Sequence, residues 1–460
     1  MNCRGKNINM LTGSLYRNIL LFTIPIALSS MLQQLFNAAD TAIVGLFDTS
    51  SALAAVGTNG EIIALIVSLS SGLSIGVNVL IARQIGHEKE CASAHSRTEA
   101  QLLQKRHMAS MIQTSMLLAV MIGVAGLITG QCMSAPLLRL IHTPSDILDT
   151  SVLYLRIYFL SYPFLLLYDF GAAILRAYGN SRSPFAALTL SGIANVLLNL
   201  VFVAGFRLGV SGVAAATVLS TMCSAVLVLC RLKKETAASP FSLRPCDIRS
   251  EYMMTVLRIG IPSAVQGAVF CFANIFVQAS VNGFGSTAIA GSTIAMNFEY
   301  FTYYVITAFG QTATTFTSQN YSAGQHERCR KILRICMMFS VLSSLLLIEP
   351  LILFRTFFAG IFSTDQTVIR HACLRMMCIL FFEPLCSLYE IPSGFLRGTG
   401  HSLYPAVAAI LGTCCFRILW ICTVFRQYEQ LQVLYYAFPL SWVLTIGLVW
   451  VGVLVIKPVK

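Results

Sequence analysis

Apolar stretches of about 20 residues recur along the whole chain, and about twelve of them are long enough to cross a bilayer as helices. Only 11% of the 460 residues are charged and 56% are hydrophobic, so a soluble protein of this size could not cover its surface. The sequence therefore predicts an all-α integral membrane protein. The predicted spans lie near 18–47, 60–81, 109–131, 151–174, 184–206, 209–230, 254–279, 288–316, 333–354, 371–394, 404–425 and 433–456.

The basic residues follow a topological pattern. The net charge is +12, from 31 Lys and Arg against 19 Asp and Glu, and most of the basic residues fall in the N-terminus, the C-terminus and alternate connections. The positive-inside rule then predicts a multi-pass protein of the cell membrane with both termini in the cytoplasm. The charge gives no reason to expect nucleic acid as a partner. The basic segment 86–110 is either a pH-responsive element or, as we favour, a helix on anionic lipid.

The chain contains a duplication. Aligning Leu175-Arg176 with Leu396-Arg397, a shift of 221 residues, brings further residues into register. These are Pro163 with Pro384, Tyr168 with Tyr389, Asp169 with Glu390, Gly179 with Gly400 and Pro184 with Pro405. A second match, IPIALSSMLQQLFNAAD from Ile24 with IPSAVQGAVFCFANIFV from Ile261, pairs Asn37 with Asn274. We predict two six-helix lobes, 1–235 and 253–460, joined by a cytoplasmic linker at 236–252, and parallel repeats of this kind are typical of transporters.

A polar stripe interrupts the first apolar run. Gln33, Asn37 and Asp40 are spaced i, i+4 and i+7, which places them on one face of a helix. An ionised carboxylate at mid-membrane costs about 3 kcal/mol or more, so it normally faces a polar cavity and indicates function. The alternative is an acid that only fixes helix packing.

Partners for Asp40 can be sought by the same spacing. Asn195 and Asn199 share a helix face in the fifth predicted span, and Thr217 lies in the sixth. Carboxylate, amide and hydroxyl oxygens together could hold a proton or a hard cation such as sodium. Each asparagine taken singly could equally serve as an interhelical hydrogen-bonding residue. The residue opposite Asp40 in the second half is Val277, which favours a coupling site confined to the N-terminal lobe.

Motifs along nearly the whole chain resemble the multidrug and toxic compound extrusion (MATE) transporters. They are Pro25 with Asp40 fifteen residues later, ILRAYGNSRSP followed by NVLLN, GVSGVAAAT, NFEY, TTFTSQNYSAG and GFLRGTGHSLYP, in that order. The resemblance implies two six-helix lobes around a V-shaped central cavity. It also implies export of cationic, amphipathic drugs by antiport with protons or sodium ions, without any other cofactor, and we expect a monomer.

The resemblance also carries over individual residues. The family's first-helix aspartate falls on Asp40, its fifth-helix polar pair on Asn195 and Asn199, and its sixth-helix threonine on Thr217. One branch has an aspartate where this chain has Asn199. The NorM branch has further acids in helices seven and ten, at the positions of Phe270 and Cys386 here, so this chain is predicted to couple through the N-terminal lobe.

Further polar residues are candidates for the substrate cavity or for gating. The predicted substrate cavity comprises Gln33, Gln34, Asn37, Gln266, Asn274, Met296, Glu299 and Tyr300, with Tyr303 beside them, although packing would explain each one alone. Glu299 could meet a cationic substrate or pair with an arginine. Asp169 and Glu390 are predicted to have a gate or structural role, reaching Arg176 and Arg397 only through intermediates, and Pro25 is a predicted point of bending.

Other classes of protein fit less well. A lipid-linked saccharide flippase of the same superfamily would need a cavity rich in arginine, but only Arg156, Arg375 and Arg417 approach the predicted spans. An enzyme is not expected, because the histidines fall in or near loops and no HExxH or nucleophile-elbow motif occurs. The sequence has no GxxxxGK[ST] motif for an ATP-driven pump and no paired metal-binding cysteine motif.

Overall fold

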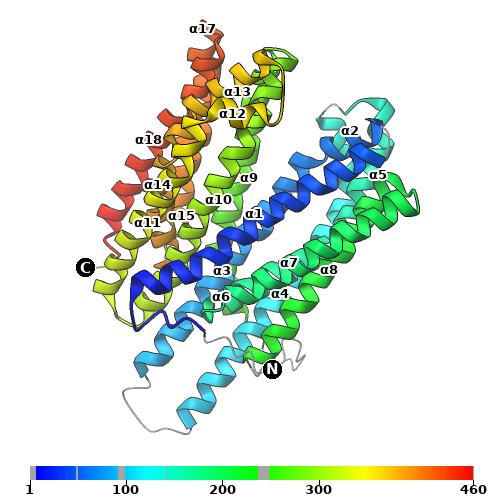
Figure 1. The fold of residues 1–460 in the computed structure, drawn as a ribbon. Coiled ribbons are helices and arrows are strands. Elements are labelled where there is room, and N and C mark those ends of the chain that lie inside the picture. The colour runs from blue at the N-terminus through cyan, green and yellow to red at the C-terminus, as the bar shows by residue number, and fades with distance from the viewer. Residues whose placement is uncertain (1–6, 48–49, 92–98, 142, 237–247, 459–460) are drawn as a thin grey trace. The chain divides into compact units, whose positions relative to one another are not determined.

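The computed structural model describes residues 7–47, 50–91, 99–141, 143–236 and 248–458, and the regular structure within these ranges is helical (Figure 1). Nine of the helices are long and apolar enough to cross a membrane, or eleven spans if each of two bent helix pairs counts as one. The remaining predicted stretch, 288–316, lies in α10 (Ser286–Ser322), which has 37 residues and a single charged residue, Glu299. Its many Thr, Ser, Tyr, Asn and Gln residues lower its hydropathy. All twelve predicted stretches thus fall on helical segments, which confirms the all-α membrane fold.

Two of the predicted spans, 151–174 and 371–394, are each made of two helices with a bend between them. The first is α5 (Ser145–Phe159) followed by α6 (Tyr162–Ala177), bent by 42°. The second runs from α13 (Gln366–Cys378) and the short η3 (Leu380–Phe382) into α14 (Leu385–Gly398), bent by 44°. Pro163 and Pro384, which match in the repeat, lie at these breaks because proline cannot supply the backbone hydrogen bond that a continuing helix needs.

The chain divides into two compact units. Unit 1 comprises residues 1–9 and Leu28–Ile261, and unit 2 comprises Met10–Ala27 and Pro262–Lys460. The division runs inside two long helices, α1 (Leu15–Phe47) and α9 (Ser250–Asn282), close to the prolines within them, Pro25 and Pro262. Residues 15–27 of α1 therefore belong to unit 2, together with residues 262–282 of α9. Residues 250–261 of α9 belong to unit 1, together with residues 28–47 of α1.

Unit 1 is organised around α6. This helix packs against α3 (Gly60–Cys91), α4 (Glu99–Leu140) and α8 (Gly209–Thr236). Its other elements are α2 (Ser50–Thr58), α5, α7 (Arg182–Asn199) and the π-helix η1 (Leu200–Gly205). Ile43 and Val44 of α1 pack with Tyr154, Val203 and Val213 in one buried cluster, so the second half of α1 is anchored to α5 and α8.

Unit 2 is organised around α10, which packs against α11 (His326–Leu353), α13 and α14. Its remaining elements are α12 (Arg355–Gly360), α15 (Leu403–Ala409), η4 (Ile410–Cys415), α16 (Phe416–Trp420), η5 (Ile421–Phe425), α17 (Arg426–Tyr428) and α18 (Leu431–Ile456). The core cluster joins Val277 of α9, Tyr389 of α14 and Tyr435, Phe438 and Trp442 of α18.

Glycines allow α10 and α14 to approach closely. Gly394 and Gly398, four residues apart on α14, face α10. A Cβ atom on Gly394 would lie 2.4 Å from the carbonyl oxygen of Gly310, and one on Gly398 would lie 2.7 Å from that of Thr314. This is the small-xxx-small pattern by which membrane helices bring their backbones together. The segment GFLRG contains this small-xxx-small pattern, but it entered the prediction only as part of a family motif.

The π-helix η1 follows α7 directly, and it has a counterpart in unit 2. Adding the repeat shift of 221 to Leu200 gives Ile421, the first residue of the π-helix η5. The same shift maps α7 onto the segment from α15 to α16. The repeat thus extends beyond the residues whose identities revealed it.

Parts of three predicted segments lie outside the described residues: 92–98 in the basic segment 86–110, 237–247 in the linker, and the first six residues of the N-terminus. The described flanks of the basic segment continue α3 and begin α4. The lobe boundaries at 235 and 253 remain predictions.

Candidate functional site

Asp40 lies within α1 and is hydrogen-bonded to α7 in unit 1. The Nδ2 of Asn199 donates to Oδ1 of Asp40 at 2.5 Å, and it lies 3.3 Å from Oδ1 of Asn195. Asn195 and Asn199 are 5% and 0% exposed. Their i, i+4 spacing places both amides on the face of α7 that meets Asp40. The structure therefore brings together three of the four residues predicted for coupling through direct contacts.

Thr217, the fourth predicted residue, also reaches Asp40. Its hydroxyl donates to the carbonyl oxygen of Val213, 3.0 Å away, and lies within hydrogen-bonding reach of the Asp40 carboxyl group. The position follows from the packing of α8 against α7. A threonine bonded to the preceding turn of its own helix has a fixed rotamer, so its oxygen is held toward the carboxylate.

Asp40, Asn195, Asn199 and Thr217 form the Asp40 cluster, which has one unsatisfied hydrogen-bond acceptor. Oδ1 of Asn199 is buried without a hydrogen-bond partner, although Nδ2 of the same amide is bonded to Asp40. Buried polar atoms are normally paired, so an open oxygen beside a carboxylate is unusual. The oxygens of Asp40, Asn195 and Thr217 near it are of the kind that hold a proton or a hard monovalent cation. With one acid in the set, a bound ion of charge +1 would be neutralised.

Two tyrosines near Asp40, Tyr154 and Tyr158, were not among the predicted site residues. Tyr154 and Tyr158 of α5 are buried, and their rings stack with centroids 6.4 Å apart. Both are close enough to Asp40 to interact electrostatically with it. Their i, i+4 spacing inside an apolar span indicates that the two rings share one helix face, but aromatic pairs of this kind are common in helix packing.

The remaining predicted residues of α1 are less confined. Gln33 and Gln34 are partly exposed and Asn37 is exposed, in the part of α1 that belongs to unit 1. Gln266 is partly exposed on α9 and is not among the residues that line the pocket of unit 2. Their role in a substrate cavity stays a prediction.

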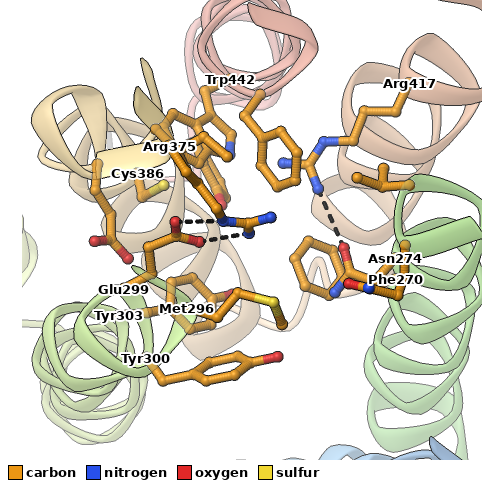
Figure 2. A pocket seen from close by; sticks show the side chains of 16 residues that line it. Phe270, Asn274, Met296, Glu299, Tyr300, Tyr303, Arg375, Cys386, Arg417 and Trp442 are labelled. Carbon is orange, nitrogen blue, oxygen red and sulfur yellow. Dashed lines mark hydrogen bonds and ion pairs between the residues drawn. The ribbon is translucent and has the colours of Figure 1, made fainter. Parts of the chain in front are cut away.

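Unit 2 contains a pocket with a cavity of about 90 Å³ (Figure 2). Four of the predicted substrate-cavity residues, Asn274, Met296, Glu299 and Tyr300, line it, and so does Tyr303. Sequence reasoning did not place Glu383, Arg375 or Arg417 in a common site. The other lining residues are Phe270, Val277, Gln278, Ile379, Cys386, Tyr389, Phe438 and Trp442.

Glu299 pairs with an arginine, one of the two possibilities that its sequence position left open. Arg375 donates from Nε and Nη2 to the two carboxylate oxygens of Glu299, both at 2.8 Å, as Figure 2 shows. Nη1 of Arg375 donates to Ser292, also at 2.8 Å. The side chains of Arg375 and Glu299 are only 4% and 12% exposed, so this bidentate pair is buried.

The prediction that Glu390 reaches Arg397 only through intermediates was wrong. Nη2 of Arg397 donates directly to Oε1 of Glu390 at 2.5 Å, because a separation of seven residues is two helical turns and both side chains are long. The matching acid of unit 1 differs: Asp169 accepts a hydrogen bond of 2.6 Å from Ser70 on α3. Asp169 thus links α6 to α3, whereas Glu390 is paired within α14, and the gate or structural role of both acids remains a prediction.

A duplicated array of membrane-crossing helices with ionisable groups among them is the architecture of a secondary membrane transporter. A model of the MatE family matches residues 25–201 and 262–422. The probable multidrug resistance protein YoeA of Bacillus subtilis is 24% identical over 446 residues, which cover 95% of this chain and 93% of that protein. The probable multidrug resistance protein NorM of Thermotoga maritima is 26% identical over 430 residues, covering 91% and 87%.

Solved structures agree on the fold. A crystal structure described as MATE in the straight conformation has a TM-score of 0.87 at 21% identity, and the match covers 99% of each chain. A transporter of the MOP superfamily from Pyrococcus furiosus has a TM-score of 0.88, also at 21% identity and 99% coverage of each chain. The chain belongs to the MatE family of multidrug efflux transporters. It is a multi-pass membrane transporter and not an enzyme, as predicted.

Proposed function

We propose that the protein exports cationic, amphipathic compounds by antiport with protons or sodium ions, and that Asp40 is the coupling carboxylate. The proposal includes two lobes, 1–235 and 253–460, a cytoplasmic linker between them, cytoplasmic termini and a monomeric transporter. Family membership supports multidrug efflux. The finer assignments rest on the Asp40 cluster.

The observation that carries the proposal is the set of hydrogen bonds that α7 and α8 make to Asp40. Asn199 and Thr217 both reach the carboxylate, and Asn199 keeps one buried oxygen open. A residue needed only for packing would be expected to satisfy its neighbours fully. An open acceptor next to an acid instead supports reversible occupation by a proton or a sodium ion.

The coupling step follows from charge. Binding of a cation neutralises Asp40, and the bond from Asn199 to a charged oxygen is replaced by a weaker one to a neutral group. Asn199 lies where α7 passes into the π-helix η1, and π-helical turns occur frequently at functional sites. The cation drives transport if it binds the two conformations with different affinity, and exposure or burial of this carboxylate supplies such a difference.

Ethidium efflux from cells that carry the wild type or Asp40→Asn tests the proposal, with external pH and sodium varied independently. We expect wild-type efflux to follow one of the two gradients and the variant to lose at least nine-tenths of that efflux. This estimate corresponds to about 1.4 kcal/mol or more of lost coupling free energy. Asp149→Asn is the matched control, because it makes the same chemical change at an exposed position on α5.

The measurement separates coupling from folding. Each variant is quantified in the membrane fraction, and efflux is normalised to that amount. Normal gradient-driven export by Asp40→Asn would remove Asp40 from the mechanism. Absence of ethidium export by the wild type under both gradients would contradict the proposed substrate class and direct attention to lipid-linked saccharides.

A further inference from the structure

Arg417 is a fully buried guanidinium in the middle of a membrane span. It lies on α16, between the π-helices η4 and η5, and it is 0% exposed. Its Nε donates to Oγ of Ser441 at 3.2 Å, and its Nη1 donates to Oδ1 of Asn274 at 3.4 Å. Its Nη2 is buried without a hydrogen-bond partner.

No carboxylate is bonded to Arg417 among the described residues. The ion pairs found there are Glu299–Arg375 and Glu390–Arg397, so the charge of Arg375 is matched while that of Arg417 is not. The partners of Arg417 are a neutral amide, a hydroxyl and two rings, with the guanidinium carbon 4.0 Å from the centroid of Phe438 and 5.5 Å from that of Phe270. An arginine buried in a membrane protein without a bonded acid is costly and indicates a functional site.

Arg417 also lines the cavity of about 90 Å³ in unit 2 (Figure 2). Six of the sixteen side chains that line the cavity are aromatic, including those of Tyr300 and Trp442, and they suit a flat apolar group. Glu383 lines the same cavity, is 4% exposed, and has its Oε2 buried without a partner. The pocket thus presents one unmatched atom of each sign, a guanidinium nitrogen and a carboxylate oxygen.

We propose that this pocket binds amphipathic aromatic zwitterions and that Arg417 receives their carboxylate. The carboxylate would complete the hydrogen bonding of Nη2 with a charge-assisted bond, the kind for which guanidinium groups are best suited. Glu383 then favours compounds that carry a positive charge as well, over simple anions. The inference rests on the proposed function in one respect, that the ligand is a transported compound, and it extends the substrate class from cations to zwitterions at this pocket.

Two dyes that share a xanthylium core and differ only at the benzoate group test the proposal, because the benzoate ring is the part small enough to enter the cavity of about 90 Å³. Rhodamine 110 has a free carboxylate, and rhodamine 123 is its methyl ester. Fluorescence anisotropy with the purified full-length protein in lipid nanodiscs, without any ion gradient, gives the dissociation constant of each dye. We expect the wild type to bind rhodamine 110 about tenfold more tightly, the magnitude of one hydrogen bond between charged groups.

Two variants of Arg417 test whether this residue causes the preference for rhodamine 110. Arg417→Gln is expected to bind both dyes with equal affinity, and Arg417→Lys, which keeps the charge without the planar fork, to retain only part of the preference. Size-exclusion chromatography shows whether each variant is folded. If Arg417→Gln does not fold, the wild type and Arg417→Lys still decide the matter. Equal affinity of the wild type for the two dyes, or an unchanged ratio in a folded Arg417→Gln protein, would overturn the assignment.

The binding assay is independent of coupling. Asp40→Asn is expected to leave the ratio of the two dissociation constants unchanged, because Asp40 belongs to unit 1 and the pocket to unit 2. Loss of gradient-driven export with an intact tenfold ratio supports both proposals. If the wild type keeps the tenfold ratio of dissociation constants but shows no gradient-driven export, antiport alone is rejected. If the wild type exports the dye along a gradient but binds the two dyes equally, the zwitterion site alone is rejected.

Discussion

Glu299→Gln is expected to lower the free energy of unfolding of unit 2 by about 3–5 kcal/mol, the usual cost of breaking a buried ion pair by removing one partner. The substitution keeps the shape of the side chain but leaves Arg375, which is 4% exposed, with an uncompensated charge. The remaining bond from Arg375 to Ser292 does not neutralise that charge.

Thermal unfolding followed by tryptophan fluorescence measures the effect in unit 2 specifically. All three tryptophans of the chain, Trp420, Trp442 and Trp450, lie in that unit. The double variant Glu299→Gln with Arg375→Met should recover most of the loss, because it leaves no unpaired charge. Glu349→Gln, at an exposed position on α11, should stay within about 0.5 kcal/mol of the wild type. A single Glu299→Gln variant as stable as this control would show that the pair contributes nothing.

Gly394→Ala is expected to destabilise unit 2 by about 1–3 kcal/mol, the cost of overpacking a closely packed interior. The added Cβ would lie 2.4 Å from the carbonyl oxygen of Gly310. That oxygen belongs to the backbone of α10 and cannot rotate away, so the two helices must separate.

Gly447→Ala provides the matched comparison, with the opposite sign expected. Gly447 lies within α18 in the same unit, and a Cβ atom there would meet nothing within 4 Å. Alanine favours a helix over glycine by about 0.5–1 kcal/mol, so this variant should be slightly more stable than the wild type. The same fluorescence measurement ranks the two variants. Equal stabilities would mean that α10 and α14 are not in the close contact described.

Most of the fold could be predicted because it depends on the hydropathy and the repeats that are read directly along the sequence. A run of about 20 apolar residues can only be a span, and the identities between the halves reveal the duplication. The bends at Pro163 and Pro384 could have been inferred from the matching prolines, but no break was predicted in either segment. The π-helices could not be foreseen, because one extra residue in a turn leaves the hydropathy of the span unchanged.

The Asp40 cluster could be predicted for a related reason. A carboxylate in an apolar run is conspicuous, and the i, i+4 spacing of Asn195 and Asn199 places them on one face. The pocket of unit 2 was harder, since its charged residues come from three segments far apart in the chain: Glu299, then Arg375 with Glu383, then Arg417. Only their packing decides that Glu299 meets Arg375 while Arg417 meets no carboxylate.

The paired π-helices η1 and η5 bear on the history of the chain. A wide turn at the same place in both halves is most simply a feature of the single ancestral six-helix unit, present before that unit was copied. The residues around the turn have since diverged: Asn199 precedes η1, whereas Trp420 precedes η5 and Arg417 lies three residues further upstream. The two halves thus keep one π-helical turn in common, with an acid-centred cluster beside the first copy and a guanidinium beside the second.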